Sequence, residues 1–154
     1  MARERAFRGA STHSLDDKAR LIVPKRFLER LPAIEADFVL TASPDGCLLL
    51  LDRQSFEDLT RDIGGSVLEQ DARPRDLRRL LLGHAEDVRP DKAGRILIPE
   101  ALRQYLGLGK EDREVVVVGA GDWIELWKPD RWVTSLDRAL AGSLPTTEVG
   151  SAAG

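Results

Sequence analysis

The chain has 154 residues, 42% of them hydrophobic, with 23 Lys and Arg against 26 Asp and Glu. This composition is that of an ordinary globular domain, and the single cysteine, Cys47, excludes an internal disulfide and a cysteine-rich metal cluster. No apolar run approaches the roughly 18 residues of a membrane span, and the opening MARERAFRGA lacks the apolar stretch of a signal peptide. We therefore expect a cytoplasmic protein.

Short elements follow one another through the first half of the chain. RGASTHSL suits a strand, DDKAR a polar turn, and LIVP a short buried strand. Pro24 ends this strand and suits the first position of a helix, KRFLERL, because it has no backbone N–H to satisfy. FVLTA and CLLLL are two further strands joined by the turn SPDG. Asp52 suits the N-cap of the next helix, RQSFEDLTRDI.

The second half repeats this order after a connecting segment. PRDLRRLLLGH predicts a helix with a leucine face and an arginine face. The leucine face contains Leu77, Leu80 and Leu81, and the arginine face contains Arg75, Arg78 and Arg79. AEDVR, PDKAG and RILIP then predict strand, turn and strand, and EALRQYL a helix ended by Gly107. EVVVV and WIELW form a hairpin, and PDRWVTSLDRAL is the last helix.

The order recurs because the chain contains an internal repeat. LDDKARLIVPKRFLERL at 15–31 aligns with PDKAGRILIPEALRQYL at 90–106, which brings Asp16, Arg20 and Pro24 onto Asp91, Arg95 and Pro99. Each copy alone has too few strands to be stable, so the two copies must share one sheet or barrel. We predict one domain with repeats at 10–57 and 86–129, a linker with a connecting helix at 58–85, a C-terminal helix at 130–140 and a disordered tail at 141–154.

The doubled motif resembles the MraZ family and, more broadly, the AbrB-like (SpoVT-AbrB) regulators. The shared pattern is an Asp, three residues, an Arg, a short apolar strand and a Pro, and it stands twice, at 16–24 and 91–99. FRGASTHSLDDKAR and RRLLLGHAEDVRPDKAGRILIP resemble the opening and the middle of that family. Two residues depart from the pattern: Ala19 stands where glycine is usual, and Pro90 where an apolar residue is common.

The resemblance implies a mainly β fold with helices (α+β), a pseudo-two-fold double-split β-barrel of two interleaved repeats. It also implies sequence-specific binding of double-stranded DNA at promoter direct repeats by a ring-shaped homo-oligomer without a cofactor. The implied role is control, chiefly repression, of the division and cell-wall gene cluster by a nucleoid-associated protein. The alternative from a different class is an antitoxin-like or oligomerisation module whose main partner is a protein.

Arg20 and Arg95 are the main candidates for DNA contact. Arginine carries a rigid fork of donors that fits guanine edges and phosphate, but each Asp could equally tie its own Arg and hold the turn. The residues alone do not decide between these roles, and the resemblance favours DNA contact. Lys18, Lys92 and, more weakly, Arg8 are then candidates for phosphate contact. The structural role falls to the turn residues Asp16, Asp91, Gly94, Pro24 and Pro99.

Other chemistry has little support. The net charge of −3 counts against nucleic acid, but residues 1–30 carry eight basic against four acidic side chains, and local charge decides a binding face. The two histidines, His13 and His84, have no clustered ligands that would make a metal site. The three tryptophans, Trp123, Trp127 and Trp132, favour a core or subunit interface over base stacking.

One mismatch in the repeat bears on the backbone. Gly94 predicts a positive φ in the second turn, whereas Ala19 predicts that the first turn uses a negative φ. On this interpretation the two loops are unequal, and Arg20 and Arg95 need not contribute equally to binding.

Overall fold

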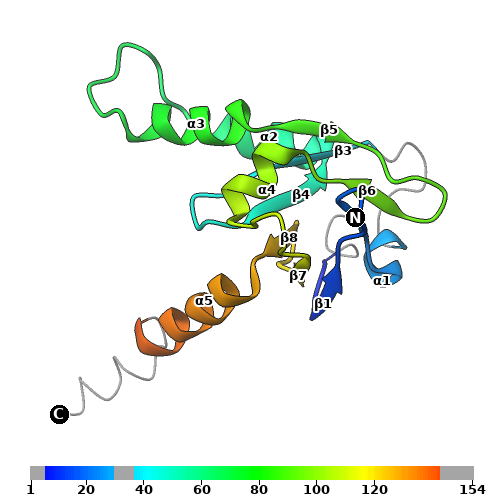
Figure 1. Cartoon of the computed structure of the whole chain (residues 1–154). Helices are drawn as coiled ribbons and strands as arrows, with labels where there is room; N and C mark the ends of the chain where they lie inside the picture. The colour runs from blue at the N-terminus through cyan, green and yellow to red at the C-terminus, as the bar shows by residue number, and fades with distance from the viewer. Residues whose placement is uncertain (1–5, 30–36, 143–154) are drawn as a thin grey trace.

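A computed structural model describes residues 6–29 and 37–142, and the two halves of the chain build matching sets of elements (Figure 1). The first half contains β1 (Ala10–Ser14), β2 (Arg20–Ile22), α1 (Lys25–Leu28), β3 (Phe38–Ala42), β4 (Leu48–Asp52) and α2 (Arg53–Asp62). After α3 (Arg73–Gly83), the second half contains β5 (Glu86–Val88), β6 (Arg95–Leu97), α4 (Glu100–Leu106), β7 (Glu114–Gly119), β8 (Ile124–Trp127) and α5 (Pro129–Gly142).

The two halves interleave in one antiparallel sheet. Six strands lie in the order β1-β7-β8-β4-β3-β5, and β2 pairs with β6 in a separate two-stranded ribbon. β1 of the first repeat therefore pairs with β7 of the second, while β5 of the second repeat pairs with β3 of the first. Neither repeat can form its sheet alone. The predicted mainly β fold with helices (α+β) is confirmed, and its sheet is antiparallel.

The strand registers reveal the pseudo-two-fold relation. In the ribbon, Leu21 lies opposite Ile96, its own equivalent in the second repeat. In the centre of the sheet, Leu49 lies opposite Glu125, which is again its repeat equivalent at an offset of 76. In both pairs a residue thus lies opposite its own equivalent in the other repeat. This is the arrangement required where a two-fold axis passes between two copies of one strand.

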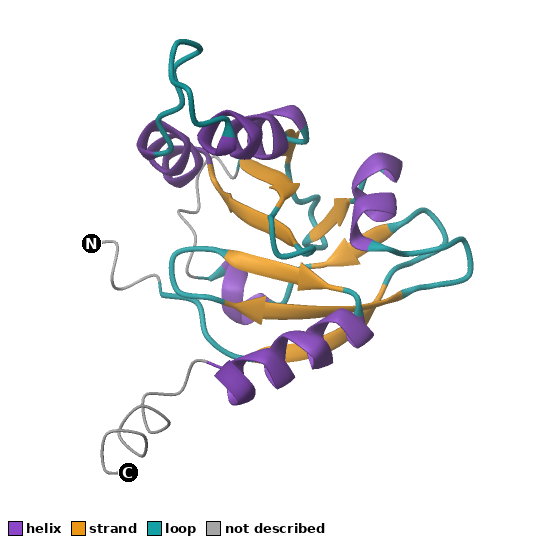
Figure 2. Ribbon diagram, turned by 90° about the vertical axis from the view of Figure 1, so that its left-hand side faces the viewer, coloured by secondary structure: helices purple, strands orange, loops and turns teal. Residues whose placement is uncertain are grey.

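Alternation along the strands divides the core between the two faces of the sheet. On one face, residues such as Leu40, Val117 and Leu126 pack with Leu21 and Ile96 of the ribbon. On the other face, a second cluster is covered by helices α2, α3 and α5; it contains Val39, Cys47, Leu49, Leu51, Phe56, Leu81, Val116, Val118 and Trp127. The ribbon and its turns thus lie on the face opposite these helices (Figure 2).

Most local predictions are confirmed, with two corrections. Asp52 caps α2 by accepting from the Ser55 N–H at 2.7 Å, and Gly107 ends α4 at φ 87°. From the predicted arginine face of α3, Arg78 donates to the Thr60 carbonyl of α2. α5 continues to Gly142, past the predicted limit of 140. Pro24 and Pro99 are N-caps that precede the first helical residue. The end of KRFLERL and residues 143–154 of the predicted tail lie outside the described residues.

Candidate nucleic-acid interface

A carboxylate organises the first turn, which leads into β2. Asp16 Oδ1 accepts from the backbone N–H groups of Lys18 and Arg20, both at 2.9 Å. Asp16 Oδ2 accepts from Nε of Arg20 at 2.8 Å. The backbone closes the same turn through Asp16 N–H to Arg20 O at 3.0 Å. One carboxylate therefore fixes both the turn and the root of the arginine side chain.

The second turn repeats this network with matching distances. Asp91 Oδ1 accepts from the N–H groups of Ala93 and Arg95 at 2.9 Å, and Asp91 Oδ2 accepts from Nε of Arg95 at 2.8 Å. In both turns the arginine side chain donates to the Asp carboxylate only through Nε. The terminal nitrogens of Arg20 and Arg95 donate no hydrogen bond to any described residue, so both guanidinium forks can serve an outside acceptor.

These bonds favour the charged form of each carboxylate. The backbone N–H of Arg20 is the largest cause that lowers the pKa of Asp16 below 3.8, and its side chain adds to the effect. The pKa of Asp91 is lowered in the same way by Arg95. The two carboxylates, Asp16 and Asp91, are therefore held in the charged form.

Both turns use a left-handed residue before the arginine. Gly94 has φ 83°, as its residue type predicts, and Ala19 has φ 61°. The prediction of a negative φ at Ala19 is therefore wrong. The shared bonds from Asp16 and Asp91 impose one backbone path on both turns, and this path overrides the preference of an L-residue.

The turns of the two repeats are also tied to each other. The carbonyl of Gly94 accepts from Val23 N–H at 2.9 Å, and the carbonyl of Ala19 accepts from Ile98 N–H at 3.1 Å. These bonds extend the ribbon beyond β2 and β6. Pro24 and Pro99 come next, where no donor is required, and their carbonyls accept the first bonds of α1 and α4. The two arginines thus stand on one rigid ribbon.

The other predicted cations occupy different places. Lys18 and Lys92 are exposed within the turns, but they are not equivalent: Lys18 matches Ala93, and Lys92 matches Asp17. Arg8 is exposed before β1, whereas the Asp16 turn follows the end of β1, so the length of this strand separates Arg8 from that turn. The structure joins the lysines to the arginine turns and leaves Arg8 apart.

Two apolar residues on the ribbon, which the sequence prediction does not include, are exposed. Leu21 and Ile96 point into the core, whereas Ile22 and Leu97 are 55% and 54% exposed. Since side chains alternate along a strand, they share the outer face of the ribbon with Arg20 and Arg95. The period-two pattern in RLI and RIL carried this signal, but a short apolar run predicts a strand that is wholly buried.

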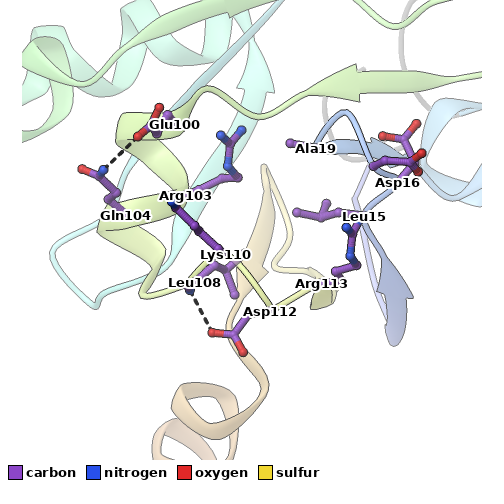
Figure 3. A pocket seen from close by; sticks show the side chains of 12 residues that line it. Leu15, Asp16, Ala19, Glu100, Arg103, Gln104, Leu108, Lys110, Asp112 and Arg113 are labelled. Atoms are coloured by element: carbon purple, nitrogen blue, oxygen red, sulfur yellow. Dashed lines mark hydrogen bonds between the residues drawn. The ribbon is translucent and has the colours of Figure 1, made fainter.

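An open pocket of about 430 Å³ lies beside the first turn (Figure 3). Ala19 and Asp16 lie on one side, and Arg103 and Gln104 of α4 on another. Several charges around it are already engaged: Arg103 donates to the Ile98 carbonyl, and Asp112 accepts from Gly109 N–H at 2.8 Å. Its lining mixes cations and carboxylates, with no group that marks a particular chemistry.

The remaining candidate groups are engaged within the fold. Burial raises the pKa of the Cys47 thiol to about 12, which makes it a poor nucleophile. Glu125 accepts from the indole N–H groups of Trp123 and Trp127, at 3.0 and 2.9 Å. Trp127 is buried in the second core cluster and Trp123 packs against it, which agrees with the predicted role in the core or a subunit interface. His13 bonds Ser11 Oγ at 2.7 Å, and burial followed by Arg26 lowers its pKa.

Neither a metal-binding cluster nor a membrane-spanning helix occurs among the described residues. No group of three or more His, Cys, Asp or Glu side chains there is arranged to hold a metal ion. No helix there combines the length and apolar character needed to cross a membrane.

The geometry defines a class of protein: a pseudo-symmetric fold that presents two matching Asp–Arg turns on one β-ribbon. The model of the family described as "MraZ protein, putative antitoxin-like" matches residues 6–78 and 81–148, and each stretch contains one of these turns. The chain belongs to the MraZ family.

Curated relatives cover most of the chain. It is 41% identical over 136 residues to a protein of Nitrosospira multiformis, and this alignment covers 88% of this chain and 90% of the relative. It is 42% identical over 132 residues to a protein of Thioalkalivibrio sulfidiphilus, spanning 85% of each, and 39% identical over 136 residues to one of Thermomicrobium roseum, spanning 88% of this chain and 90% of the relative. Each of these relatives is named transcriptional regulator MraZ.

Proposed function

We propose that this chain is a transcription regulator that binds promoter direct repeats in double-stranded DNA and acts chiefly as a repressor of the division and cell-wall gene cluster. The observation that carries the proposal is the pair of Asp–Arg turns, because each leaves a guanidinium fork free of described partners on a rigid, two-fold related ribbon. The names of the relatives support regulation rather than catalysis. The protein would then work at the nucleoid.

The chemistry of the candidate residues suits three roles in DNA binding: base contact, phosphate contact and positioning of the arginines. Arg20 and Arg95 reach base edges, since arginine is the residue best suited to the two acceptors of guanine in the major groove. Lys18 and Lys92 neutralise phosphates beside them, and Arg8 is a more distant phosphate contact. Asp16 and Asp91 hold the arginines at Nε and leave the terminal nitrogens available.

Self-association is part of the proposal. α5 exposes Val133, Leu136 and Leu140, at 55%, 43% and 67%, and their spacing places them along one side of the helix. By contrast, α2, the equivalent helix of the first repeat, lies beside α3 (Figure 1). An exposed apolar stripe of this kind marks an interaction surface, which supports the predicted ring of identical subunits.

Binding of DNA should therefore depend on the number of repeats. One subunit offers few phosphate contacts within an acidic chain, whereas linked subunits gain through effective concentration. We expect DNA with one repeat to bind at least about tenfold more weakly than DNA with several. Equal affinity for one repeat and several would refute this use of a ring.

A gel shift with the DNA upstream of the gene tests the proposal most simply. A specific complex should form there and not on DNA of the same length with the repeats scrambled. The logarithm of affinity should fall with the logarithm of salt concentration, by about 0.9 per neutralised phosphate. No shift, or a shift insensitive to salt, would favour the alternative of an antitoxin-like module with a protein partner.

A further inference from the structure

We propose that Ile22 and Leu97 read the 5-methyl groups of thymines beside the bases contacted by Arg20 and Arg95. This inference rests on the proposed DNA binding and adds residues that determine sequence preference. Ile22 and Leu97 are more than half exposed, although they stand on strands whose inner residues, Leu21 and Ile96, are fully buried. Their position on the outer face leaves both aliphatic side chains available to a partner.

The register places each aliphatic side chain beside an arginine. Arg20 lies directly opposite Leu97, and Ile22 directly opposite Arg95. Directly opposed side chains on one face of an antiparallel pair lie about 4.5–5.5 Å apart at Cβ. The outer face of the ribbon thus carries an Arg–Leu pair and an Ile–Arg pair, related by the pseudo-two-fold axis between Leu21 and Ile96.

This pattern matches the chemistry of the DNA major groove. The groove accommodates a two-stranded β-ribbon, and its floor offers both the guanine acceptors that suit arginine and the thymine methyl that suits an aliphatic side chain. Successive base pairs are about 3.4 Å apart, so an arginine and the aliphatic residue opposite it can reach neighbouring base pairs. Lys18 and Lys92, in the turns that lead into the two strands, would meet phosphates.

A protein partner fits this face less well. The two exposed aliphatic residues do not form a continuous apolar patch, because Arg20 and Arg95 alternate with them on the same face. A protein that covered Ile22 and Leu97 would have to pair two guanidinium groups at the same time. DNA supplies negative charge and methyl groups together, which makes it the better complement.

The test replaces thymine by uracil in the DNA, which removes only the 5-methyl group. The probe is the DNA upstream of the gene, prepared once with thymine and once with uracil throughout. The wild-type chain should bind the uracil probe more weakly, by about fourfold for each thymine methyl group that Ile22 or Leu97 covers. The double variant Ile22→Ala/Leu97→Ala should bind both probes with affinities within about twofold of each other. Because both residues are exposed, its melting temperature should match that of the wild type.

A matched control comes from the segment between α2 and α3. Val67→Ala/Leu68→Ala also trims exposed aliphatic residues, but away from the ribbon and from α5, and it should keep the full preference for thymine. Should the double ribbon variant bind neither probe measurably, the single variants Ile22→Ala and Leu97→Ala decide, since each should lose part of the preference. A wild type that binds both probes equally would overturn the inference while leaving DNA binding intact. A full preference retained by every ribbon variant would overturn it as well.

Discussion

The two Asp–Arg turns share one backbone but differ in what surrounds it. At the first turn, Ala19 borders an open pocket, so its methyl group has room despite the left-handed φ. At the second, a Cβ on Gly94 would lie 2.9 Å from Cδ1 of Leu28. The residue equivalent to Leu28 is Arg103, which lines the pocket at the first turn. The comparison explains why alanine is accommodated in one turn and glycine stands in the other.

The turns also differ in charge at one exposed position, which is 17 in the first turn and 92 in the second. Asp17 in the first turn corresponds to Lys92 in the second, so residues 16–20 have no net charge and residues 91–95 carry +1. The Asp and the Arg, whose side chains form the turn network, are the same in both copies, whereas the three residues between them differ. The network therefore constrains the identity of the two residues that build it with their side chains, and not of those that contribute only backbone groups.

Of the turn substitutions, Gly94→Ala should have the largest effect on stability. It tests whether the second turn tolerates a Cβ less well than the first. It places an L-residue at positive φ and crowds Leu28, so we expect a loss of about 1–2 kcal/mol. The melting temperature should fall by several degrees. Leu28→Ala in the same chain should relieve part of the crowding, and an unchanged or higher melting temperature for Gly94→Ala alone would break the comparison.

Ala19→Gly should act in the opposite direction and by less. It removes the left-handed penalty of roughly 1–2 kcal/mol, but it adds freedom to the unfolded chain that offsets about 0.4–1 kcal/mol. We expect a net gain of up to about 1 kcal/mol in urea unfolding. Destabilisation by this glycine would mean that the Ala19 methyl group makes favourable contacts that outweigh its backbone strain.

Charge exchange at the equivalent positions should change affinity by a few-fold. Asp17→Lys gives position 17 the side chain of its equivalent, Lys92, and raises the charge of residues 16–20 from 0 to +2, so it should tighten DNA binding and steepen the salt slope by about 0.9 if it gains a phosphate. Lys92→Asp should do the reverse. The melting temperatures should hardly change, because neither side chain takes part in the turn network. Opposite shifts in affinity would contradict the placement of DNA at these turns.

Acid should weaken both turns by a small amount. The pKa of Asp16 and of Asp91 is lower in the folded chain than the usual 3.8, so their stabilisation is fully present above that pH. It is lost as the pH falls below 3.8 towards the folded-state pKa. Asp91→Asn can keep the backbone bonds but cannot titrate, so its melting temperature should fall less than that of the wild type between about pH 5 and pH 3. An equal fall in the melting temperatures of the variant and the wild type would show that folding does not lower the pKa of Asp91.

The sequence predicted the repeated elements well because their signals are local. Prolines, caps and alternating apolar residues placed the strands and helices, and the repeat itself predicted that the two halves share one sheet. The exchange of β1 and β5 between the repeats was not predicted in detail, since strand pairing depends on contacts distant in sequence. The φ of Ala19 was missed because a network of hydrogen bonds overrode a residue preference. The exposure of Ile22 and Leu97 was missed because burial depends on what covers a strand.

Replacement of the two arginines tests the central claim most directly. Arg20→Ala/Arg95→Ala should abolish DNA binding, since each arginine that reads a base is worth roughly 1–3 kcal/mol and a ring multiplies the effect. The melting temperature should stay within a few degrees, because solvent still reaches each Asp–Arg pair and the carboxylates keep their bonds to the backbone N–H groups. Arg79→Ala, which removes a similar Asp–Arg pair on α3, is the matched control and should bind as the wild type does. Full DNA binding by the double variant would contradict the account, and so would unfolding of a chain that differs from the wild type only in these two side chains.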